Sequence, residues 1–216
     1  MRTFDYLPGH KGIKIVQDDE MFRVNTDTFV LGEFLNIYRE DVCLDIGTNN
    51  GALLLYASLF NPKKLIGIDL NEKALELAKI NLEQNGVTNF ELKVADANTY
   101  IGEEVDVIIC NPPYFKELDK SKNEYLSLAK HEDNLPLSNL IKTISLNLKL
   151  NGTLFFLFQT PRLAEVMKEL EKNNLIVKLL KFVYDENKDY SNVTLIKAVK
   201  CAQSGLNVEK PIIIKR

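Results

Sequence analysis

The stretch that decides the fold reads VCLDIGTNNGALLLYASLFNPKKLIGIDL and covers residues 42–70. It contains a short apolar run at 42–48, a segment with helical periodicity at 51–60, and a second apolar run at 63–70. Short continuous apolar runs of this kind are typical of strands that are buried on both faces of a parallel sheet. Strand, helix and strand at this spacing predict a right-handed crossover between two parallel strands.

The same alternation continues along the chain. Asn71 can cap a helix in which Leu75, Ala78 and Leu82 recur at helical spacing, and Asn85-Gly86 supplies its C-terminal stop. Further strands are predicted at 89–96, 105–113, 152–159, 175–184 and 192–200, and further helices at about 136–149 and from near Pro161 to about 173. The sequence therefore predicts an α/β fold with a seven-stranded, doubly wound, mostly parallel sheet that ends in an antiparallel hairpin. Residues 1–41 precede the sheet as an arm with a predicted helix at 26–37.

Composition and charge limit the function classes. Hydrophobic residues make up 45% and charged residues 26% of the 216, which is typical of a globular domain and excludes a disordered chain. The net charge of −3 taken alone argues against a nucleic-acid binder. However, residues 1–113 carry a net charge of −8, and residues 114–216 carry +5. This asymmetry suggests that one face meets a polyanion, although a chance distribution of solvated charges is an alternative.

Other sequence signals are mostly negative. There is no apolar run long enough to span a bilayer and no signal-peptide pattern. Cys43 and Cys110 lie inside apolar runs, so we expect buried thiols, and neither the cysteines nor His10 and His131 have metal-ligand spacing. We therefore expect a soluble, cytoplasmic, monomeric protein that needs no membrane and no metal.

The loop after the first strand indicates a nucleoside-cofactor site. Gly47 permits a tight turn away from the strand, and Gly51 permits close packing where the next helix begins. Asp69 ends the second strand, where an acid can accept hydrogen bonds from a ribose diol. Asp45 suits a cationic or amino-bearing ligand. Asn49 stands where the dinucleotide fingerprint has a glycine, so its side chain would enter the space of a pyrophosphate, which argues against NAD.

Asp96 completes a row of acids at three successive strand ends. Its carboxylate can accept from an adenine amino group, while the N–H of Ala97 can donate to a ring nitrogen. A single acid at a strand end is more often a helix cap, but three such acids together favour a ligand site.

The fourth strand ends in Asn111-Pro112-Pro113-Tyr114. A stiff turn is the plain interpretation of the two prolines. The functional interpretation also explains the flanking residues, because the Asn111 side-chain oxygen and the Pro112 carbonyl can grip one planar amino group while Tyr114 stacks on its base. Such a nitrogen is a poor nucleophile, and two acceptors stabilise the positive charge that develops on it. A sulfonium methyl donor then needs neither a metal nor a nucleophilic residue, and water can take the proton.

These motifs together resemble the class I S-adenosylmethionine-dependent methyltransferases, which have a Rossmann-like fold, and among them the amino methyltransferases that carry NPPY. Residues 21–35, MFRVNTDTFVLGEFL, are similar to the F-x-V-x-T-D-x-x-L-L-G segment of the bacterial tRNA(Val) adenine N6-methyltransferases. The resemblance implies one methyltransferase domain over 1–216, with residues 1–41 packed on the cofactor site. It implies S-adenosylmethionine as cofactor and, as substrate, the tRNA(Val) adenine beside the anticodon, adenine 37. The cofactor-binding residues are then Asn25, Thr26, Asp27, Asp45, Gly47, Asn49, Gly51, Asp69, Leu70, Asp96, Ala97 and Asn111, although Thr26 could equally be only an N-cap.

Other functions stay open at this point. Release-factor glutamine methyltransferases also use NPPY but carry a helical domain before the catalytic one, and DNA adenine methyltransferases usually add a recognition domain. Guanine N2 methyltransferases of ribosomal RNA tend to have Phe after the two prolines. Asn111 and Tyr114 argue against a non-catalytic nucleoside-binding module, and Asn49 with NPPY argues against an NAD oxidoreductase. The candidate RNA contacts follow the NPPY motif and are Lys116, Lys120, Lys122, Lys130 and His131, with further lysines near the C-terminus, Lys178, Lys181, Lys188, Lys197, Lys200 and Lys210. An ordinary surface loop is the alternative for 115–131.

Overall fold

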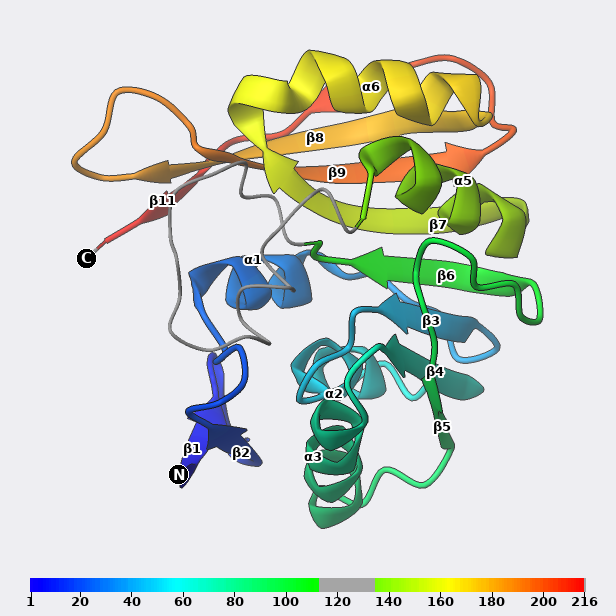
Figure 1. Ribbon diagram of the computed structural model, residues 1–216. Coiled ribbons are helices and arrows are strands. Elements are labelled where there is room, and N and C mark those ends of the chain that lie inside the picture. Colours follow the sequence, from blue (N-terminus) through cyan, green and yellow to red (C-terminus); the bar gives the residue numbers. More distant parts are fainter. Residues whose placement is uncertain (113–134, 216) are drawn as a thin grey trace.

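The computed structural model describes residues 1–112 and 135–215, and its centre is a large twisted sheet with helices on both faces (Figure 1). The strands are β1 (Arg2–Leu7), β2 (His10–Asp18), β3 (Val42–Ile46), β4 (Lys64–Asp69), β5 (Phe90–Val94), β6 (Val105–Cys110), β7 (Leu148–Gln159), β8 (Leu175–Asp185), β9 (Val193–Lys200), β10 (Asn207–Val208) and β11 (Ile212–Ile214). The helices are α1 (Thr26–Phe34), α2 (Ala52–Ser58), α3 (Glu72–Gln84), α5 (Leu137–Asn147), the 3₁₀ turn η2 (Thr160–Arg162) and α6 (Leu163–Lys172).

The order of strands in the sheet is β10-β8-β9-β7-β6-β3-β4-β5. The strands from β3 to β7 are parallel, while β9 is antiparallel to both β7 and β8. This confirms the doubly wound sheet and its antiparallel hairpin, and β3 lies at the switch point, with β4 on one side and β6 on the other. The sheet has nine strands rather than the predicted seven, because β10 and β11 add to the free edge of β8. Strands of two and three residues are too short to leave a period in the sequence.

Apolar residues pack on both faces of the sheet. Along β3, for example, Cys43 faces the side covered by α1 and α2, and Leu44 faces the side covered by α5 and α6. This two-sided burial explains why the strands read as continuous apolar runs. Cys43 and Cys110 are fully buried, as predicted, and burial raises the pKa of both thiols.

The helix α3 confirms the signals read from its sequence. The Asn71 side chain accepts a hydrogen bond from the Lys73 N–H at 3.0 Å, and Leu82 is fully buried. Gly86 ends the helix in the left-handed region at φ 75°.

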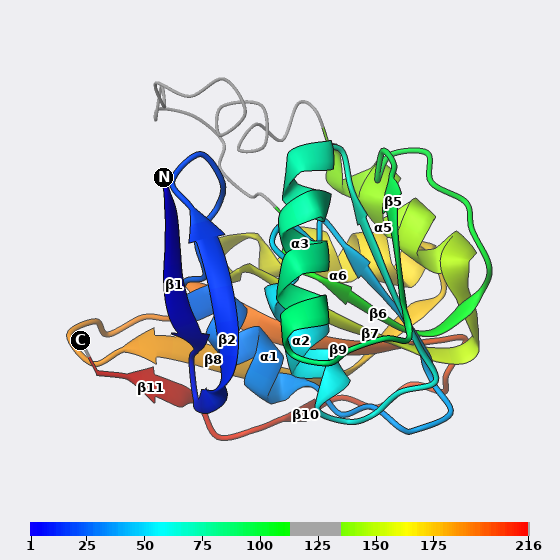
Figure 2. The same ribbon diagram turned by 90° about the horizontal axis from the view of Figure 1, so that it is seen from below.

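The N-terminal arm contains more structure than the sequence indicated. Its helix α1 ends at Phe34, three residues before the predicted end, and a β-hairpin formed by β1 and β2 precedes it. Figure 2 shows this hairpin beside α3. Its turn is held against α2, because the Tyr56 hydroxyl donates to the Pro8 carbonyl at 2.7 Å. We name residues 2–18 the N-terminal hairpin.

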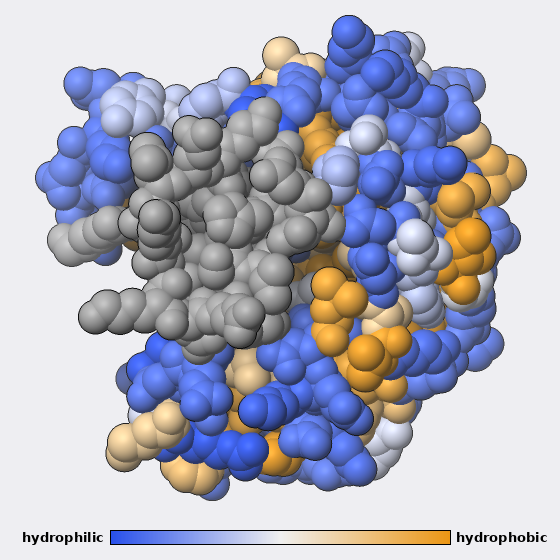
Figure 3. Space-filling view, viewed as in Figure 1, coloured by the Kyte–Doolittle hydropathy of each residue, from blue (hydrophilic) through white to orange (hydrophobic). Residues whose placement is uncertain are grey.

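The surface shown in Figure 3 is mainly hydrophilic, and its apolar residues form small separate groups. Among the described helices, none is long and apolar enough to cross a bilayer.

Candidate active site

The register of the central strands brings the predicted site residues to one edge of the sheet. β3 pairs with β4 and β6 in registers that end at Ile46↔Ile68 and Ile46↔Cys110, so the next residues along the chain, Gly47, Asp69 and Asn111, follow at the same edge. Neighbouring strands are about 4.8 Å apart, so Gly47 lies between Asp69 on one side and Asn111 on the other. Asp96 lies two residues beyond the end of β5, on the far side of Asp69. In Figure 1 the arrowheads of β3, β4 and β6 all point toward this edge.

The loop after β3 has the geometry that its glycines predict. Gly47 has φ 76°, and its N–H and that of Thr48 both donate to the Ile68 carbonyl at 2.9 Å. Gly51 has φ 78°, and a Cβ there would lie 3.1 Å from the Cβ of Ala78 in α3. The first glycine thus permits the turn, and the second permits close packing of α2 on α3.

Asp45 is a buried carboxylate that lacks one partner. Its Oδ2 accepts a hydrogen bond from the Thr48 hydroxyl at 2.7 Å, whereas its Oδ1 has no partner in the described part of the chain. Burial raises the pKa of Asp45 to about 7; the Thr48 bond opposes the rise, and the charge of Asp69 adds to it. A buried acceptor without a donor is costly, and an ammonium group is the donor that suits it best. The ammonium of S-adenosylmethionine fits this requirement.

Asp69 fixes the backbone around it and keeps capacity for a ligand. Its Oδ2 accepts from the Asn49 N–H and its Oδ1 from the Asn71 N–H, both at 2.9 Å. Burial raises its pKa, and these backbone hydrogen bonds oppose the rise. Since an ionised carboxylate can accept about four hydrogen bonds, a ribose diol could still bind here. The next residue, Leu70, is 65% exposed and offers an apolar surface beside the acid.

Asn49 has a role that its sequence position did not reveal. Its φ is 46°, in the left-handed region, and its Nδ2 donates to the Phe22 carbonyl at 2.6 Å. We predicted that this side chain would enter the space of a pyrophosphate. The structure instead bonds it to the segment that precedes α1, so the cofactor loop and the N-terminal arm are in direct contact.

The segment 25–27 begins α1. Asn25 is the N-cap, because its Oδ1 accepts from the Thr28 N–H at 3.0 Å. The alternative that Thr26 is the cap is therefore wrong by one residue, and Thr26 and Asp27 lie in the first turn. Phe22, three residues earlier, is the point at which this segment contacts the cofactor loop.

The remaining predicted residues lie along the same edge. Asp96 shapes its own turn, since its Oδ1 accepts from the N–H and the side-chain amide of Asn98 at 2.8 and 2.9 Å. Ala97 is partly buried against the core. Asn111 is half-buried, and Pro112 is buried. Outside the described residues lie the other predicted positions, Pro113, Tyr114, Lys116, Lys120, Lys122, Lys130 and His131.

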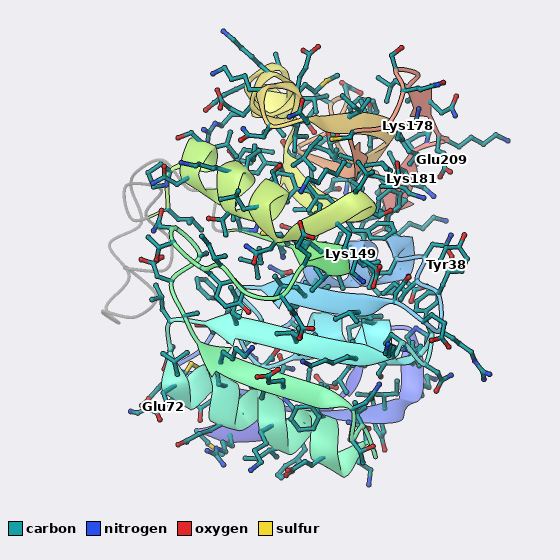
Figure 4. The ribbon with its side chains drawn as sticks, turned by 90° about the vertical axis from the view of Figure 1, so that its right-hand side faces the viewer. Tyr38, Glu72, Lys149, Lys178, Lys181 and Glu209 are labelled. Carbon is teal, nitrogen blue, oxygen red and sulfur yellow. The ribbon has the colours of Figure 1, made fainter. Side chains whose placement is uncertain are left out.

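Several of the C-terminal lysines are engaged with groups of this chain. Lys181 pairs with Glu209 at 3.2 Å, Lys178 donates to the Gln203 carbonyl at 3.0 Å, and Figure 4 shows these two lysines on the same part of the molecule. Lys200, at the end of β9, donates to a backbone carbonyl at 2.6 Å. These internal contacts reduce their availability for phosphates.

Sequence reasoning missed one buried polar residue near the site. Asn81, on α3, is fully buried and bonds to the glycine loop. A signal was present, because Asn81 falls between Ala78 and Leu82 on the apolar face of the predicted helix.

The strand order, the glycine loop and the acids at this edge define a class I S-adenosylmethionine-dependent methyltransferase. A family model described as a methyltransferase domain matches residues 38–203. A solved structure from Agrobacterium tumefaciens, described as a predicted O-methyltransferase, is similar with a TM-score of 0.67 and 19% identity over 87% of each chain, which shows the fold.

Curated relatives indicate which family of this class the chain resembles. A protein of Aliivibrio salmonicida is 30% identical over 80% of this chain and 75% of its own length, and one of Shewanella woodyi is 27% identical over 89% and 84%. Both are named tRNA1(Val) (adenine(37)-N6)-methyltransferase. The chain belongs to this family, and S-adenosylmethionine is its methyl donor.

Proposed function

We propose that the protein transfers a methyl group from S-adenosylmethionine to N6 of an adenine in tRNA, at adenine 37 of tRNA(Val). The observation that carries the proposal is the position of Asn111, at the end of β6 and next to the glycine loop after β3. An amide at this place can present its oxygen to an exocyclic amino group beside the cofactor. The names of the relatives supply the substrate and the position.

In this proposal each acid at the carboxyl edge binds a different group of the cofactor. The free Oδ1 of Asp45 accepts from the cofactor's ammonium, and Asp69 accepts from the ribose hydroxyls. Asp96 accepts from the adenine amino group, and the Ala97 N–H donates to a ring nitrogen. Residues 25–27 lie toward the methionine end, which agrees with the contact between Phe22 and the loop. Leu70 packs against the adenine with its exposed side chain.

The chemistry required of this chain is orientation and charge stabilisation. The cofactor supplies an electrophilic methyl group on a sulfonium. The Asn111 oxygen and the Pro112 carbonyl accept the two hydrogens of the adenine amino group, which favours a tetrahedral nitrogen and stabilises the charge that develops there. The methylated nitrogen then loses one of these two protons to water. Pro113 as a rigid support and Tyr114 as a stacking partner remain predictions from the sequence.

The substrate base must leave its stack to reach this edge. A base in an anticodon loop can be turned out at low cost, because it is not held in a duplex. The lysines that follow Tyr114 are proposed to contact phosphates, which makes RNA affinity sensitive to salt.

Labelled S-adenosylmethionine and unmodified tRNA(Val) transcript test the proposal. After digestion to nucleosides we expect label in N6-methyladenosine, and no label with a transcript that carries guanine at position 37. Asn111→Ala should lose nearly all of the product, whereas Glu40→Ala, at an exposed position before β3 and therefore at the opposite edge of the sheet, should keep it. Label that appears in protein and not in RNA would instead indicate glutamine methylation.

A further inference from the structure

The side-chain amide of Asn81, in α3, is fully buried and uses its full hydrogen-bonding capacity. Asn81 Oδ1 accepts from the Val16 N–H at 2.7 Å and from the Gln84 side chain at 2.9 Å. Its Nδ2 donates to the Val16 carbonyl at 2.9 Å and to the Asn50 carbonyl at 2.8 Å. An amide has two donors and two acceptor sites, so no other side chain of this size could make the same four bonds.

These bonds join two regions that are far apart in sequence. Val16 lies in β2 of the N-terminal hairpin, and Asn50 lies in the glycine loop, directly before Gly51. Toward β2, Asn81 acts as a neighbouring strand would, since it pairs with both the N–H and the carbonyl of one residue. Figure 2 shows β2 running alongside α3.

A second contact joins the glycine loop to the segment that follows the N-terminal hairpin. The adjacent loop residue, Asn49, donates to the Phe22 carbonyl at 2.6 Å. Phe22 follows Met21, which is buried and receives the side-chain amide of Asn71 on its sulfur at 3.5 Å. Two consecutive residues of the cofactor loop are therefore held by the N-terminal arm, one through Asn81 and one directly.

We propose that Asn81, together with Asn49, is a positioning residue that couples docking of the N-terminal hairpin to the conformation of the glycine loop. Because the Asn81 amide holds Val16 and Asn50 at once, displacing the hairpin releases the loop carbonyl. Cofactor affinity then depends on hairpin docking, and by reciprocity the cofactor tightens the hairpin. The inference concerns cofactor binding alone, so it stands or fails separately from the identity of the RNA.

The chain offers a matched control one helical turn away. Asn85 also bonds to the hairpin, since its Oδ1 accepts from the Lys14 N–H at 3.0 Å and its Nδ2 donates to the Lys14 carbonyl at 2.7 Å. Its Nδ2 also donates to the Asn81 carbonyl at 2.7 Å, and within the described residues Asn85 bonds to no group of the glycine loop. If Asn81 acted on the hairpin alone, as Asn85 does, the two variants would have the same effect on cofactor affinity.

The experiment compares wild type, Asn81→Ala and Asn85→Ala as purified proteins. Calorimetric titration with S-adenosylhomocysteine gives the dissociation constant, and hydrogen exchange over residues 10–18, with and without this ligand, reports hairpin docking. We expect both variants to melt at lower temperature, but only Asn81→Ala to weaken binding by about tenfold or more and to lose ligand-induced protection of β2. Equal losses of affinity in the two variants, or wild-type affinity in Asn81→Ala, would overturn the proposal.

Asn49→Gly provides an independent test if Asn81→Ala does not fold. Glycine adopts a positive φ more easily than asparagine, so the backbone is relaxed while the bond to Phe22 is lost. We expect weaker binding of S-adenosylhomocysteine and less ligand-induced protection of residues 10–18. Unchanged protection and affinity would contradict the coupling.

Discussion

Two acids on neighbouring strands, Asp106 and Asp45, lie at opposite strand ends and differ in how many hydrogen-bond partners the fold gives them. Asp106, near the amino end of β6, has partners for both oxygens: Lys149 Nζ lies 2.9 Å from each, and the Val42 N–H donates to Oδ2 at 2.9 Å. Asp45, near the carboxyl end of β3, has Thr48 on one oxygen and no described partner on the other. Figure 4 labels Lys149, the cation that pairs with Asp106.

The difference distinguishes a structural acid from a ligand-binding one. Asp106 with Lys149 is a local, partly exposed ion pair that joins neighbouring strand ends. Asp45 is a buried charge whose incomplete hydrogen bonding costs folding free energy, and that cost falls when a cationic ligand binds. Variants at the two ends should therefore affect different quantities, catalysis and cofactor binding at one end and stability alone at the other.

The largest effect is expected for Asn111, at the carboxyl edge of the sheet, on the rate of methyl transfer after the cofactor has bound. Asn111→Ala removes the proposed acceptor for the adenine amino group, and we expect kcat to fall by about 10²–10³-fold. Affinity for S-adenosylhomocysteine should change by no more than about threefold, because we assign Asn111 to the substrate nitrogen and not to the cofactor contact that the resemblance also implied. Single-turnover methylation and calorimetry measure the two quantities, and a variant that loses binding and turnover in parallel would refute this division of roles.

The second-largest effect distinguishes Asp45 from Asp106. Asp45→Asn should weaken S-adenosylhomocysteine by about 10–100-fold, since it removes a charge-assisted hydrogen bond. The same change should stabilise the apoprotein at pH 8, because the folded-state pKa of about 7 lies above the ordinary value of 3.8 and ionisation of the buried group therefore costs stability. Asp106→Asn should leave ligand affinity unchanged. Chemical denaturation and calorimetry on both variants provide the comparison, which fails if Asp106→Asn weakens the ligand as much.

The pH dependence of S-adenosylhomocysteine affinity should also show whether the ionised Asp45 binds the ligand, without altering the residues around Asp45. The ammonium requires the ionised form of Asp45, so affinity for S-adenosylhomocysteine should fall as pH drops below about 7, approaching tenfold per unit. Above pH 7 the dissociation constant should be flat up to the titration of the ligand's own amine. Asp45→Asn should show little dependence between pH 5.5 and 7.5, and a wild-type profile that is equally flat would count against the assignment.

The smallest effect belongs to the amino end. Lys149 has a side chain that is 43% exposed, so solvent screening limits its pairing with Asp106. Lys149→Ala should lower the free energy of unfolding by about 1 kcal/mol or less and leave cofactor affinity and methylation unaltered. A urea titration with a parallel activity assay checks this, and any loss of ligand affinity would show that the two ends are not independent.

The carboxyl edge could be predicted from sequence because local signals determine it. Gly47 and Gly51 mark the turn and the close packing, and the acids mark strand ends, so the strand alternation alone brings them together. The N-terminal hairpin was missed because its alternation is weak, although Pro8-Gly9 between two short runs is a turn signal. The strands β10 and β11 exist only because β8 offers an edge, which no local pattern encodes.

Residues whose role depends on distant partners could not be assigned from sequence. Asn49 was interpreted by its place in a fingerprint, but its side chain bonds to a carbonyl 27 residues away. Asn81 was visible as a polar residue on an apolar helix face, yet its partners in β2 and the glycine loop emerge only in the fold. Likewise, Asp45 was predicted at the site from its position, whereas the lack of a partner for its Oδ1 becomes visible only in the folded chain.

The proposed bond between Asp45 and the cofactor's ammonium can be tested with two ligands that differ by one group. Calorimetry at pH 8 would compare S-adenosylhomocysteine with its analogue lacking the α-amino group, on wild type and on Asp45→Asn. We expect wild type to prefer the amino-bearing ligand by about 10–100-fold and Asp45→Asn to show almost no preference. An equal preference in both proteins would contradict it.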